Sequence, residues 1–367
     1  MSAPAEPRWE YRNPVRIVAG DDALQALRNV VHEPARWLLM LSPGARARGL
    51  DALVQRHAPG LMHVHDAITP NPDLEDMERL IRQYRATGLQ GIVAVGGGSV
   101  IDAAKVLAIG LSENGDTLAD ALRAGNPGRW TRDVHLVAIP TTAGTGSEVT
   151  PFATVWDHER RRKHSVGGDA AYPDLCLLDA SLTLSLPPDQ TLYTALDATS
   201  HALESLWNVH RTPISESFAY RALELITASL PGVLRTPRDL ALRRAMQHAS
   251  TLAGLAISQT RTAIAHSISY PLTLRFGIPH GLACSFTLSG LLERHLDDLS
   301  TDARVRDLLE RTRSMLDALP LREHMRRYAD PDAILALRGE MVTPERAGNF
   351  RYREITSVEE ILRSALT

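Results

Sequence analysis

A strand that runs directly into a glycine-rich turn and then into a helix constrains the fold of this chain most. Gly91–Val95 is an uninterrupted apolar run, three glycines follow it, and SVIDAAKVLAI then continues without proline or glycine. The first run predicts a buried strand and the second a helix, with Ser99 at the N-cap and Asp102 completing a capping box. Glycines let the backbone approach a phosphate, and a helix N-terminus offers unpaired N–H groups. The turn is therefore a candidate phosphate-binding site.

Strands and helices alternate through the rest of the first half. RWLLMLS and LMHVHDA read as strands, 46–55 and 73–87 as helices, and DVHLVAIPTT as a further strand that ends at Pro140. This alternation predicts a parallel sheet covered by helices on both faces, with ligands at the carboxyl ends of the strands. GGGS and PTTAGTGSE both stand at such ends.

The second half reads as helical. A chain of 367 residues is long enough for two domains, and we place their boundary near 185. We therefore expect an α/β, Rossmann-like nucleotide-binding domain over 1–185 and an all-helical domain over 186–367. The expected helices are Thr191–Asn208, Pro213–Leu230, Leu240–Gln259, Arg304–Leu316 and a last one that begins near Thr356 or Ser357.

Charge and cysteine content argue against several classes of protein. The net charge is −3 with no cluster of Lys or Arg, which argues against a nucleic-acid partner. The N-terminal stretch has no apolar signal-peptide region, and no window approaches 18 uninterrupted apolar residues, so we expect no membrane association. Two cysteines, Cys176 and Cys284, give no disulfide framework. We expect a cytoplasmic protein.

A second chemical signal lies in the helical half. Asp197 and His201 are four residues apart, a spacing that puts both side chains on one face of a helix. His266 and His280 follow in AIAHSISYPLTLRFGIPHG. One carboxylate and three imidazoles suit a divalent ion such as iron or zinc, with room for a substrate oxygen. The chain has 14 His, so one such pair would arise by chance, but a metal set together with a phosphate-binding turn is far less expected.

These motifs, taken in order, resemble the iron-containing (group III) alcohol dehydrogenases. The resemblance is carried by NPVRIVAG, GGGSVIDAAK, IPTTAGTGSEVTPFATVWD, LDATSHALE, and AHSISYPLT with IPHGLACSF, and it covers nearly the whole chain. It implies an N-terminal α/β nucleotide-binding domain, an all-helical domain, and an active site in the cleft between them. It also implies Fe²⁺ as the metal, although Zn²⁺ would fit the same ligands.

The resemblance assigns roles to particular residues. Asp197, His201, His266 and His280 match the metal ligands, and Lys163 matches a lysine close to the cofactor ribose. The turn that holds the pyrophosphate corresponds to Gly97, Gly98 and Ser99, and the loop beside the nicotinamide to Thr141, Thr142, Thr145 and Ser147. The alternative for these threonines and the serine is ordinary turn chemistry, because such side chains bond nearby backbone in any case.

Two positions depart from the family pattern. Tyr270 stands where many members have a histidine, one helical turn after His266, and its phenol could pass a proton to an alkoxide or simply pack. Ser42, in MLSPGARARG, stands where many members have an acid that binds the adenosine ribose. Without that carboxylate, and with Arg46 and Arg48 nearby for a 2′-phosphate, we expect NADP(H) rather than NAD(H). The alternative is that both arginines face solvent.

The segments LDATSHALESLWNVHRTPIS and ISQTRTAIAHSISYPLT resemble the branch of this family that reduces phosphonoacetaldehyde to 2-hydroxyethylphosphonate. Such a small anionic aldehyde needs a cation, and Arg261, five residues before His266, is our first candidate. Arg275 and His164 are weaker ones, and Arg261 could instead form an ordinary salt bridge. Sulfoacetaldehyde or a neutral short-chain aldehyde stays open as the substrate.

Three other functions stay open as alternatives. A dehydroquinate-synthase-like lyase would need a broader set of basic residues, a non-haem iron oxygenase would leave the nucleotide turn unexplained, and a non-catalytic binding protein would leave four metal ligands unused. The resemblance also implies a homodimer or a larger homo-oligomer.

Overall fold

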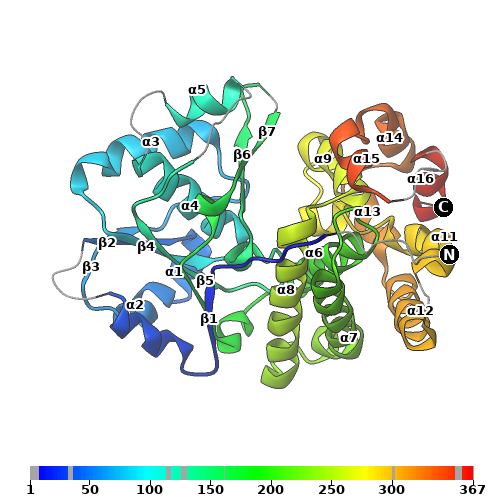
Figure 1. Cartoon of the computed structure of the whole chain (residues 1–367), viewed down its shortest axis with the longest axis horizontal. Coiled ribbons are helices and arrows are strands. Elements are labelled where there is room, and N and C mark those ends of the chain that lie inside the picture. Colours follow the sequence, from blue (N-terminus) through cyan, green and yellow to red (C-terminus); the bar gives the residue numbers. More distant parts are fainter. Residues whose placement is uncertain are drawn as a thin grey trace.

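The structure is a computed structural model that describes residues 8–31, 36–112, 117–124, 130–160, 162–299, 302–351 and 358–366. A sheet with helices around it occupies one half of the molecule and a group of helices the other (Figure 1). The segment that precedes the first strand crosses to the helical half, where the hydroxyl of Tyr11 donates to the carbonyl of Leu255 at 3.4 Å. The two-domain architecture expected from the sequence is confirmed.

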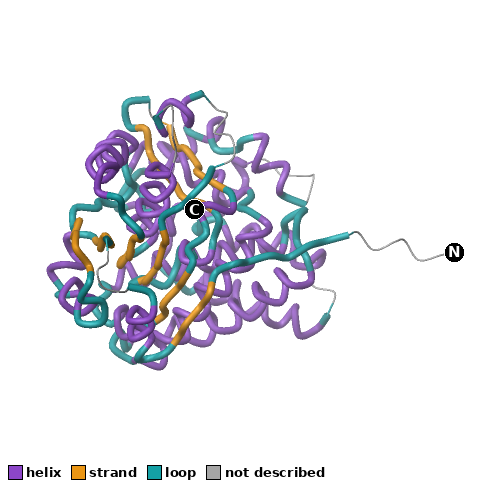
Figure 2. The backbone as a smooth tube through the Cα atoms, turned by 60° about the vertical axis from the view of Figure 1, so that its left-hand side comes forward, coloured by secondary structure: helices purple, strands orange, loops and turns teal. Residues whose placement is uncertain are grey.

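Six strands form one wholly parallel sheet in the order β1-β8-β5-β4-β2-β3. The strands are β1 (Arg16–Ala19), β2 (Trp37–Leu41), β3 (Leu61–His65), β4 (Gly91–Gly96), β5 (His135–Pro140) and β8 (Leu175–Leu178). In β4, Ile92 and Ala94 enter one apolar core while Val93 and Val95 enter the core on the opposite face. Both faces of the sheet are therefore covered, which explains why this strand reads as one continuous apolar run (Figure 2).

The helices around the sheet differ from expectation at one glycine. They are η1 (Ala23–Asn29), α1 (Pro43–Ala47), α2 (Leu50–Gln55), α3 (Leu74–Tyr84), η2 (Arg85–Thr87), α4 (Gly98–Ser112), α5 (Leu118–Arg123), η3 (Ser147–Val149), η4 (Asp169–Ala171) and η5 (Ala180–Thr183). The single helix expected over 46–55 is two short helices, because Gly49 adopts a left-handed conformation with φ of 74°. The helix expected over 73–87 is confirmed as α3 and η2, and the Asp73 carboxylate caps it.

The capping box predicted at the glycine-rich turn is wrong. Helix α4 already begins at Gly98, so Ser99 lies inside its first turn, and the Ser99 hydroxyl accepts from the backbone N–H of Asn71 at 3.2 Å. The carboxylate of Asp102 turns away from the helix end and accepts from the hydroxyl of Ser147. Asp102 thus bonds Ser147, which is distant in the sequence, instead of the start of its own helix.

A hairpin of β6 (Phe152–Asp157) and β7 (Arg162–Gly167) was not anticipated. It stands on the side of the α/β domain nearest α9 and carries Lys163 (Figure 1). The hairpin is separate from the six-stranded sheet, and it places the Lys163 side chain at the interface between the domains.

The long helices of the second half agree with the sequence to within a few residues at most ends. They are α6 (Pro188–Leu206), α7 (Pro213–Arg235), α8 (Leu240–Thr260) and α12 (Ala303–Asp317). Shorter helices complete the domain: α9 (Ile264–Phe276), α10 (His280–Ala283), α11 (Leu288–Leu299), α13 (Leu321–Arg326), α14 (Pro331–Ala336), η6 (Arg338–Glu340), α15 (Pro344–Asn349) and α16 (Val358–Leu366). The boundary predicted near 185 lies between β8 and α6. Thr356 and Ser357, the expected caps of the last helix, lie outside the described residues.

Candidate active site

Three helices bring the predicted metal donors together around one carboxylate oxygen. Asp197 and His201 lie one turn apart on α6, and the Asp197 Oδ1 to His201 Nε2 distance is 3.5 Å. The Nε2 atoms of His266 on α9 and His280 on α10 lie 3.6 and 3.8 Å from the same oxygen. All four residues identified from spacing and family resemblance therefore meet, although His266 and His280 come from different helices.

A glycine allows the helix of His280 to approach α6. Gly281 packs against the backbone of Tyr193, and a Cβ added at Gly281 would lie 1.8 Å from the Tyr193 carbonyl oxygen and 3.2 Å from the Asp197 Cβ. No side chain larger than hydrogen fits there without moving backbone. Gly281, which directly follows His280, therefore allows the His280 side chain to lie close to Asp197.

Glu204, which sequence reasoning missed, orients the His266 ring. Its carboxylate is completely buried and accepts from the backbone N–H groups of Ala265 and His266 and from His266 Nδ1, at 2.7, 3.2 and 2.5 Å. A carboxylate can only accept, so Nδ1 carries the proton and Nε2 is free toward Asp197. The signal was present, because Glu204 follows His201 by three residues and Asp197 by seven on the same face of α6.

Cys284 is a second residue that the sequence did not reveal. Its buried thiol lies 3.6 Å from Asp197 Oδ1, and donor atoms of Asp197, His266, His280 and Cys284 all lie within 4.8 Å of one another. His201 adjoins this group through its contact with Asp197 and through its ring, which stacks on His266 at a centroid distance of 5.0 Å. Burial raises the pKa of the Cys284 thiol well above its ordinary value, so the isolated site holds it protonated.

The protonation states of this cluster suit a metal ion. Burial lowers the pKa of His201, and partial burial of His280, whose side chain is 34% exposed, lowers its pKa too. Burial alone would raise the pKa of Asp197, but the surrounding imidazoles hold it well below its usual range. The His266 Nε2 and His201 Nδ1 atoms are buried without a hydrogen-bond partner among the described residues. His266 differs, because the Glu204 and Asp197 carboxylates outweigh burial and raise its pKa. A carboxylate, two imidazoles held neutral and the unpartnered His266 Nε2 suit a divalent cation, which would displace any proton from that nitrogen.

The two glycine- and threonine-rich turns also meet. A Cβ added at Gly98 would lie 2.6 Å from the Thr145 Cγ2, and one at Gly97 would lie 3.2 Å from that of Thr142. Thr141 follows β5 and its N–H donates to the Gly96 carbonyl at 2.9 Å. The predicted nucleotide-binding turn and the predicted nicotinamide loop therefore form one surface at the carboxyl ends of β4 and β5.

Ser147 has a structural partner at this edge. Its hydroxyl donates to Asp102 at 2.5 Å, and the Thr154 N–H donates to the same carboxylate at 2.8 Å. The ammonium group of Lys105 is completely buried nearby and donates to the carbonyls of Thr150 and Phe152 at 2.8 and 2.7 Å. These bonds tie α4 to the start of β6.

Lys163 and Tyr270, predicted separately, lie against each other across the domain interface. The Lys163 Nζ lies 4.0 Å from the centre of the Tyr270 ring. That ring is parallel to the His280 ring, with a centroid distance of 6.5 Å and an angle of 4°. Burial raises the pKa of Tyr270 to about 12, and burial, followed by the charge of Arg346, lowers the pKa of Lys163 to about 7. Arg346, on α15, was not singled out from the sequence.

The predicted adenosine-binding end is partly self-paired. The Ser42 hydroxyl caps α1 by accepting from the Ala45 N–H at 3.2 Å. Arg46 forms ion pairs with Asp66 and, at 3.6 Å, with Asp51. Arg48 forms no ion pair with any residue in the described ranges.

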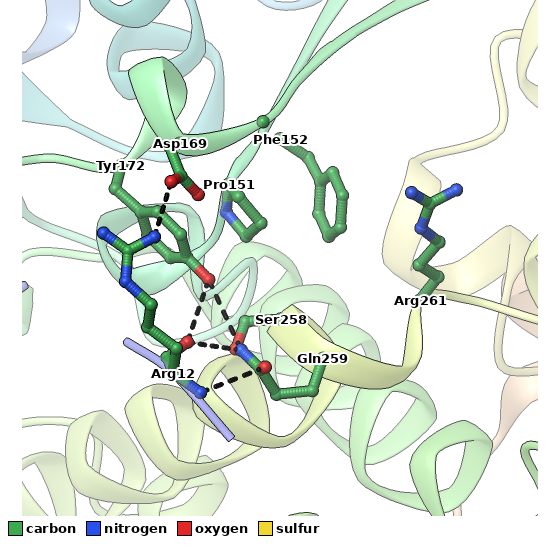
Figure 3. Close-up of a pocket in the computed structure, with 9 residues that line it drawn as sticks. Arg12, Pro151, Phe152, Asp169, Tyr172, Ser258, Gln259 and Arg261 are labelled. Atoms are coloured by element: carbon green, nitrogen blue, oxygen red, sulfur yellow. Dashed lines mark hydrogen bonds and ion pairs between the residues drawn. The ribbon is translucent and has the colours of Figure 1, made fainter. Parts of the chain in front are cut away.

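Arg261 lies apart from the metal donors. It lines a pocket of about 250 Å³ between the domains, with Phe152 on one side and Ser258 and Gln259 on the other (Figure 3). None of the four predicted metal ligands lines this pocket. The backbone of Arg261 has φ 64° and ψ 170°, a conformation normally confined to glycine.

The two weaker anion-binding candidates have carboxylates near them. Arg275 forms an ion pair with Glu340 at 3.3 Å. The Nε2 of His164 lies 3.9 Å from Asp157.

Comparison with known proteins supports this interpretation of both halves. Residues 14–180 match the profile described as iron-containing alcohol dehydrogenase, and 191–361 match the C-terminal profile of the Fe-containing alcohol dehydrogenase family. The chain is 42% identical over 234 residues to phosphonoacetaldehyde reductase of Streptomyces viridochromogenes, a match that covers 62% of this chain and 58% of that protein. It is 31% identical over 278 residues to a 1-propanol dehydrogenase of Salmonella typhimurium, which covers 76% of this chain and 71% of that protein.

A solved structure has the same architecture. Sulfoacetaldehyde reductase from Bifidobacterium kashiwanohense in complex with NAD⁺ superposes with a TM-score of 0.85 over 98% of each chain, at 26% sequence identity. Among the described residues, no helix combines the length and the apolar character needed to cross a bilayer.

Proposed function

Because this chain belongs to the iron-containing alcohol dehydrogenase family, we propose that it reduces a small aldehyde to an alcohol with a divalent metal and a nicotinamide cofactor. The observation that carries the proposal is the convergence of Asp197, His201, His266 and His280 on one buried oxygen. Beside it, the turn of Gly97, Gly98 and Ser99 packs on the loop of Thr142 and Thr145. A hydride donor and a carbonyl acceptor could thus face each other between the domains.

The metal, Fe²⁺ in this proposal, would be held by these four side chains and would act as a Lewis acid toward a carbonyl oxygen. The cofactor would supply the hydride. The chain's own residues orient these groups: Glu204 fixes the His266 tautomer, and Gly281 sets the position of His280. Tyr270 is protonated at neutral pH, and its raised pKa makes its phenol a weaker acid, so Tyr270 or solvent would protonate the product oxygen.

We propose phosphonoacetaldehyde as the substrate. The Streptomyces viridochromogenes relative is a phosphonoacetaldehyde reductase, which supports this choice. The similar fold of a sulfoacetaldehyde reductase makes a sulfonate-bearing aldehyde the first alternative. The strained backbone of Arg261 supports a functional role for this residue, since such conformations cluster at binding sites. Sulfoacetaldehyde and a neutral short-chain aldehyde such as propanal are the alternatives.

We propose NADP(H) as the preferred cofactor, because Ser42 presents no carboxylate and Arg48 has no ion pair among the described residues. The pairing of Arg46 with Asp66 and Asp51 argues in the opposite direction. Ser42→Asp should then lower kcat/KM for NADPH about tenfold and leave kcat/KM for NADH nearly unchanged. A wild-type enzyme that is more efficient with NADH would refute this preference.

The deciding experiment compares phosphonoacetaldehyde with propanal at equal concentration in anaerobic NADPH oxidation by Fe²⁺-loaded protein. A strong preference for the phosphonate supports the proposed substrate. Equal or reversed rates would leave a metal-dependent dehydrogenase and discard the phosphonate. If neither aldehyde caused any loss of NADPH, the proposed reduction would be contradicted, and a dehydroquinate-synthase-like lyase would be favoured instead. We also propose a homodimer or larger homo-oligomer, which light scattering would test.

A further inference from the structure

Two cations from different domains flank the aromatic ring that stacks on a metal donor. Lys163 reaches the Tyr270 ring from the β6–β7 hairpin, and Arg346 reaches it from α15, with its Cζ 4.8 Å from the ring centre. The ring in turn lies parallel to His280. The two cations therefore stand one aromatic ring away from the donor cluster, at the interface between the domains.

Neither cation forms a close ion pair with a carboxylate among the described residues, although Asp102 and Asp197 attract Lys163 from a greater distance. In the part of the chain that the structure describes, neither Lys163 nor Arg346 lies within 4.0 Å of a carboxylate oxygen, whereas Arg275, on the same helix as Tyr270, is paired with Glu340. Like charges brought together raise the free energy of the site, and a divalent ion on the donors adds further positive charge. A bound anion would relieve this repulsion.

The position also suits a short bifunctional substrate. An aldehyde with a phosphonate or sulfonate on its α-carbon places its anionic group only a few ångströms from the carbonyl oxygen. With the carbonyl toward Asp197 and His280, that group would extend toward the edge of the Tyr270 ring, whose centre lies 4.8 Å from the Arg346 Cζ. Arg261, by contrast, lines a pocket to which none of the four predicted metal ligands contributes.

We infer that Arg346 binds the anionic head group of the substrate and is the residue that selects a phosphonate- or sulfonate-bearing aldehyde over a neutral one. This inference rests on the proposed function. A guanidinium forms paired, charge-assisted hydrogen bonds with such oxyanions, and the stacked Tyr270 ring restricts its orientation. Lys163 adds positive charge from the facing domain when it is protonated, and a bound anion favours that protonated form.

The test compares Arg346→Gln and Arg346→Lys with the control Arg275→Gln, in the metal-loaded enzyme with saturating NADPH. We expect Arg346→Gln to raise KM for phosphonoacetaldehyde about 10- to 100-fold while kcat and KM for propanal stay close to wild type. Arg346→Lys should recover part of the loss, because it keeps the charge but not the paired geometry. Arg275→Gln should behave as wild type.

A binding measurement separates this inference from the proposed reaction. Phosphonoacetate, which carries the anionic group but no aldehyde, is titrated calorimetrically into the metal- and NADP⁺-loaded wild type and variants. Weaker binding by Arg346→Gln alone supports the inference even if phosphonoacetaldehyde proves a poor substrate. The inference would be overturned if Arg346→Gln left the affinity for phosphonoacetate unchanged. It would also be overturned if Arg346→Gln raised KM for propanal as much as for phosphonoacetaldehyde, or if Arg261→Ala, and not Arg346→Gln, weakened phosphonoacetate binding. Normal propanal turnover by the variant excludes misfolding as the cause.

Discussion

The proposed metal-donor pocket and the proposed nucleotide-binding edge of the sheet are built from different parts of the chain. The pocket consists of side chains from three helices around Asp197 Oδ1, and the buried Glu204 orients the buried His266 among them. The edge consists of backbone and small side chains, where Gly98 packs on Thr145 and Asp102 binds Ser147. Metal binding in the pocket would therefore depend on particular side chains, whereas cofactor binding at the sheet edge would depend mainly on the shape of the backbone. Substitutions should therefore separate metal affinity from cofactor affinity.

The largest effect should follow from His280→Ala. Loss of one of four donors should remove bound metal and lower kcat/KM by about 1,000-fold or more, because a Lewis acid supplies several kcal/mol of transition-state stabilisation. The His280 side chain is 34% exposed, so its removal leaves little cavity and the fold should survive. Metal analysis, kinetics and circular dichroism check this, with His248→Ala on α8 as the control. Full turnover without metal would contradict it.

Glu204→Gln should weaken metal binding without removing a donor. The amide has one oxygen, so it can accept either from His266 Nδ1 or from the two backbone N–H groups, and it no longer carries the charge that polarises the ring. Metal affinity should therefore fall about 10- to 100-fold. Competition with a chelator measures this. Glu148→Gln is the matched control, because Glu148 is also a buried carboxylate but bonds Thr251 at 3.1 Å instead of a donor. Equal effects of the two substitutions would remove the special role of Glu204.

Asp102→Asn should affect the other region alone. The amide can accept from the Thr154 N–H and donate to the Ser147 hydroxyl, but it lacks the negative charge that faces the buried Lys105 ammonium and that strengthens both hydrogen bonds. The free energy of unfolding should therefore fall by about 1–3 kcal/mol. The KM for the cofactor should rise while metal affinity stays constant. Urea denaturation, cofactor kinetics and the chelator assay measure these quantities. A parallel loss of metal would mean that the two regions are not independent.

The smallest expected change comes from Cys284→Ser. If the thiol 3.6 Å from Asp197 binds metal as a thiolate, the Co²⁺-substituted protein should have a sulfur-to-cobalt charge-transfer band that this variant lacks. Metal affinity should change by less than about tenfold, because the other donors remain. Cys176→Ser, in strand β8, should keep the band. A wild-type spectrum without such a band would exclude Cys284 as a ligand.

The grouping of the four candidate donors could be predicted from the sequence because helical periodicity and motif order are local signals. The i, i+4 spacing of Asp197 and His201 determines their common face, and the long apolar helices followed directly from the same periodicity. The parallel sheet followed from the alternation of strands and helices, with β4 as its clearest strand. Gly49 could have warned that the helix expected over 46–55 is interrupted.

The rest depended on contacts between distant segments. Arg346 follows Tyr270 by 76 residues, and only the packing of α15 on α9 brings its guanidinium to the ring. The capping box failed for the same reason, since Ser147 lies 45 residues from the Asp102 that it bonds. A sequence pattern identifies partners along one element but not partners across elements, unless a related protein supplies them.

All of the predicted metal donors belong to α6, α9 and α10, whereas the cofactor turns belong to the other domain. A hinge rotation of one domain against the other would leave every donor-to-donor distance unchanged. It would instead lengthen the separation between Lys163 and Tyr270, which spans the interface at 4.0 Å. If the proposed sites are correct, opening the domains would release the cofactor without releasing the ion, and the Lys163–Tyr270 distance would report that opening.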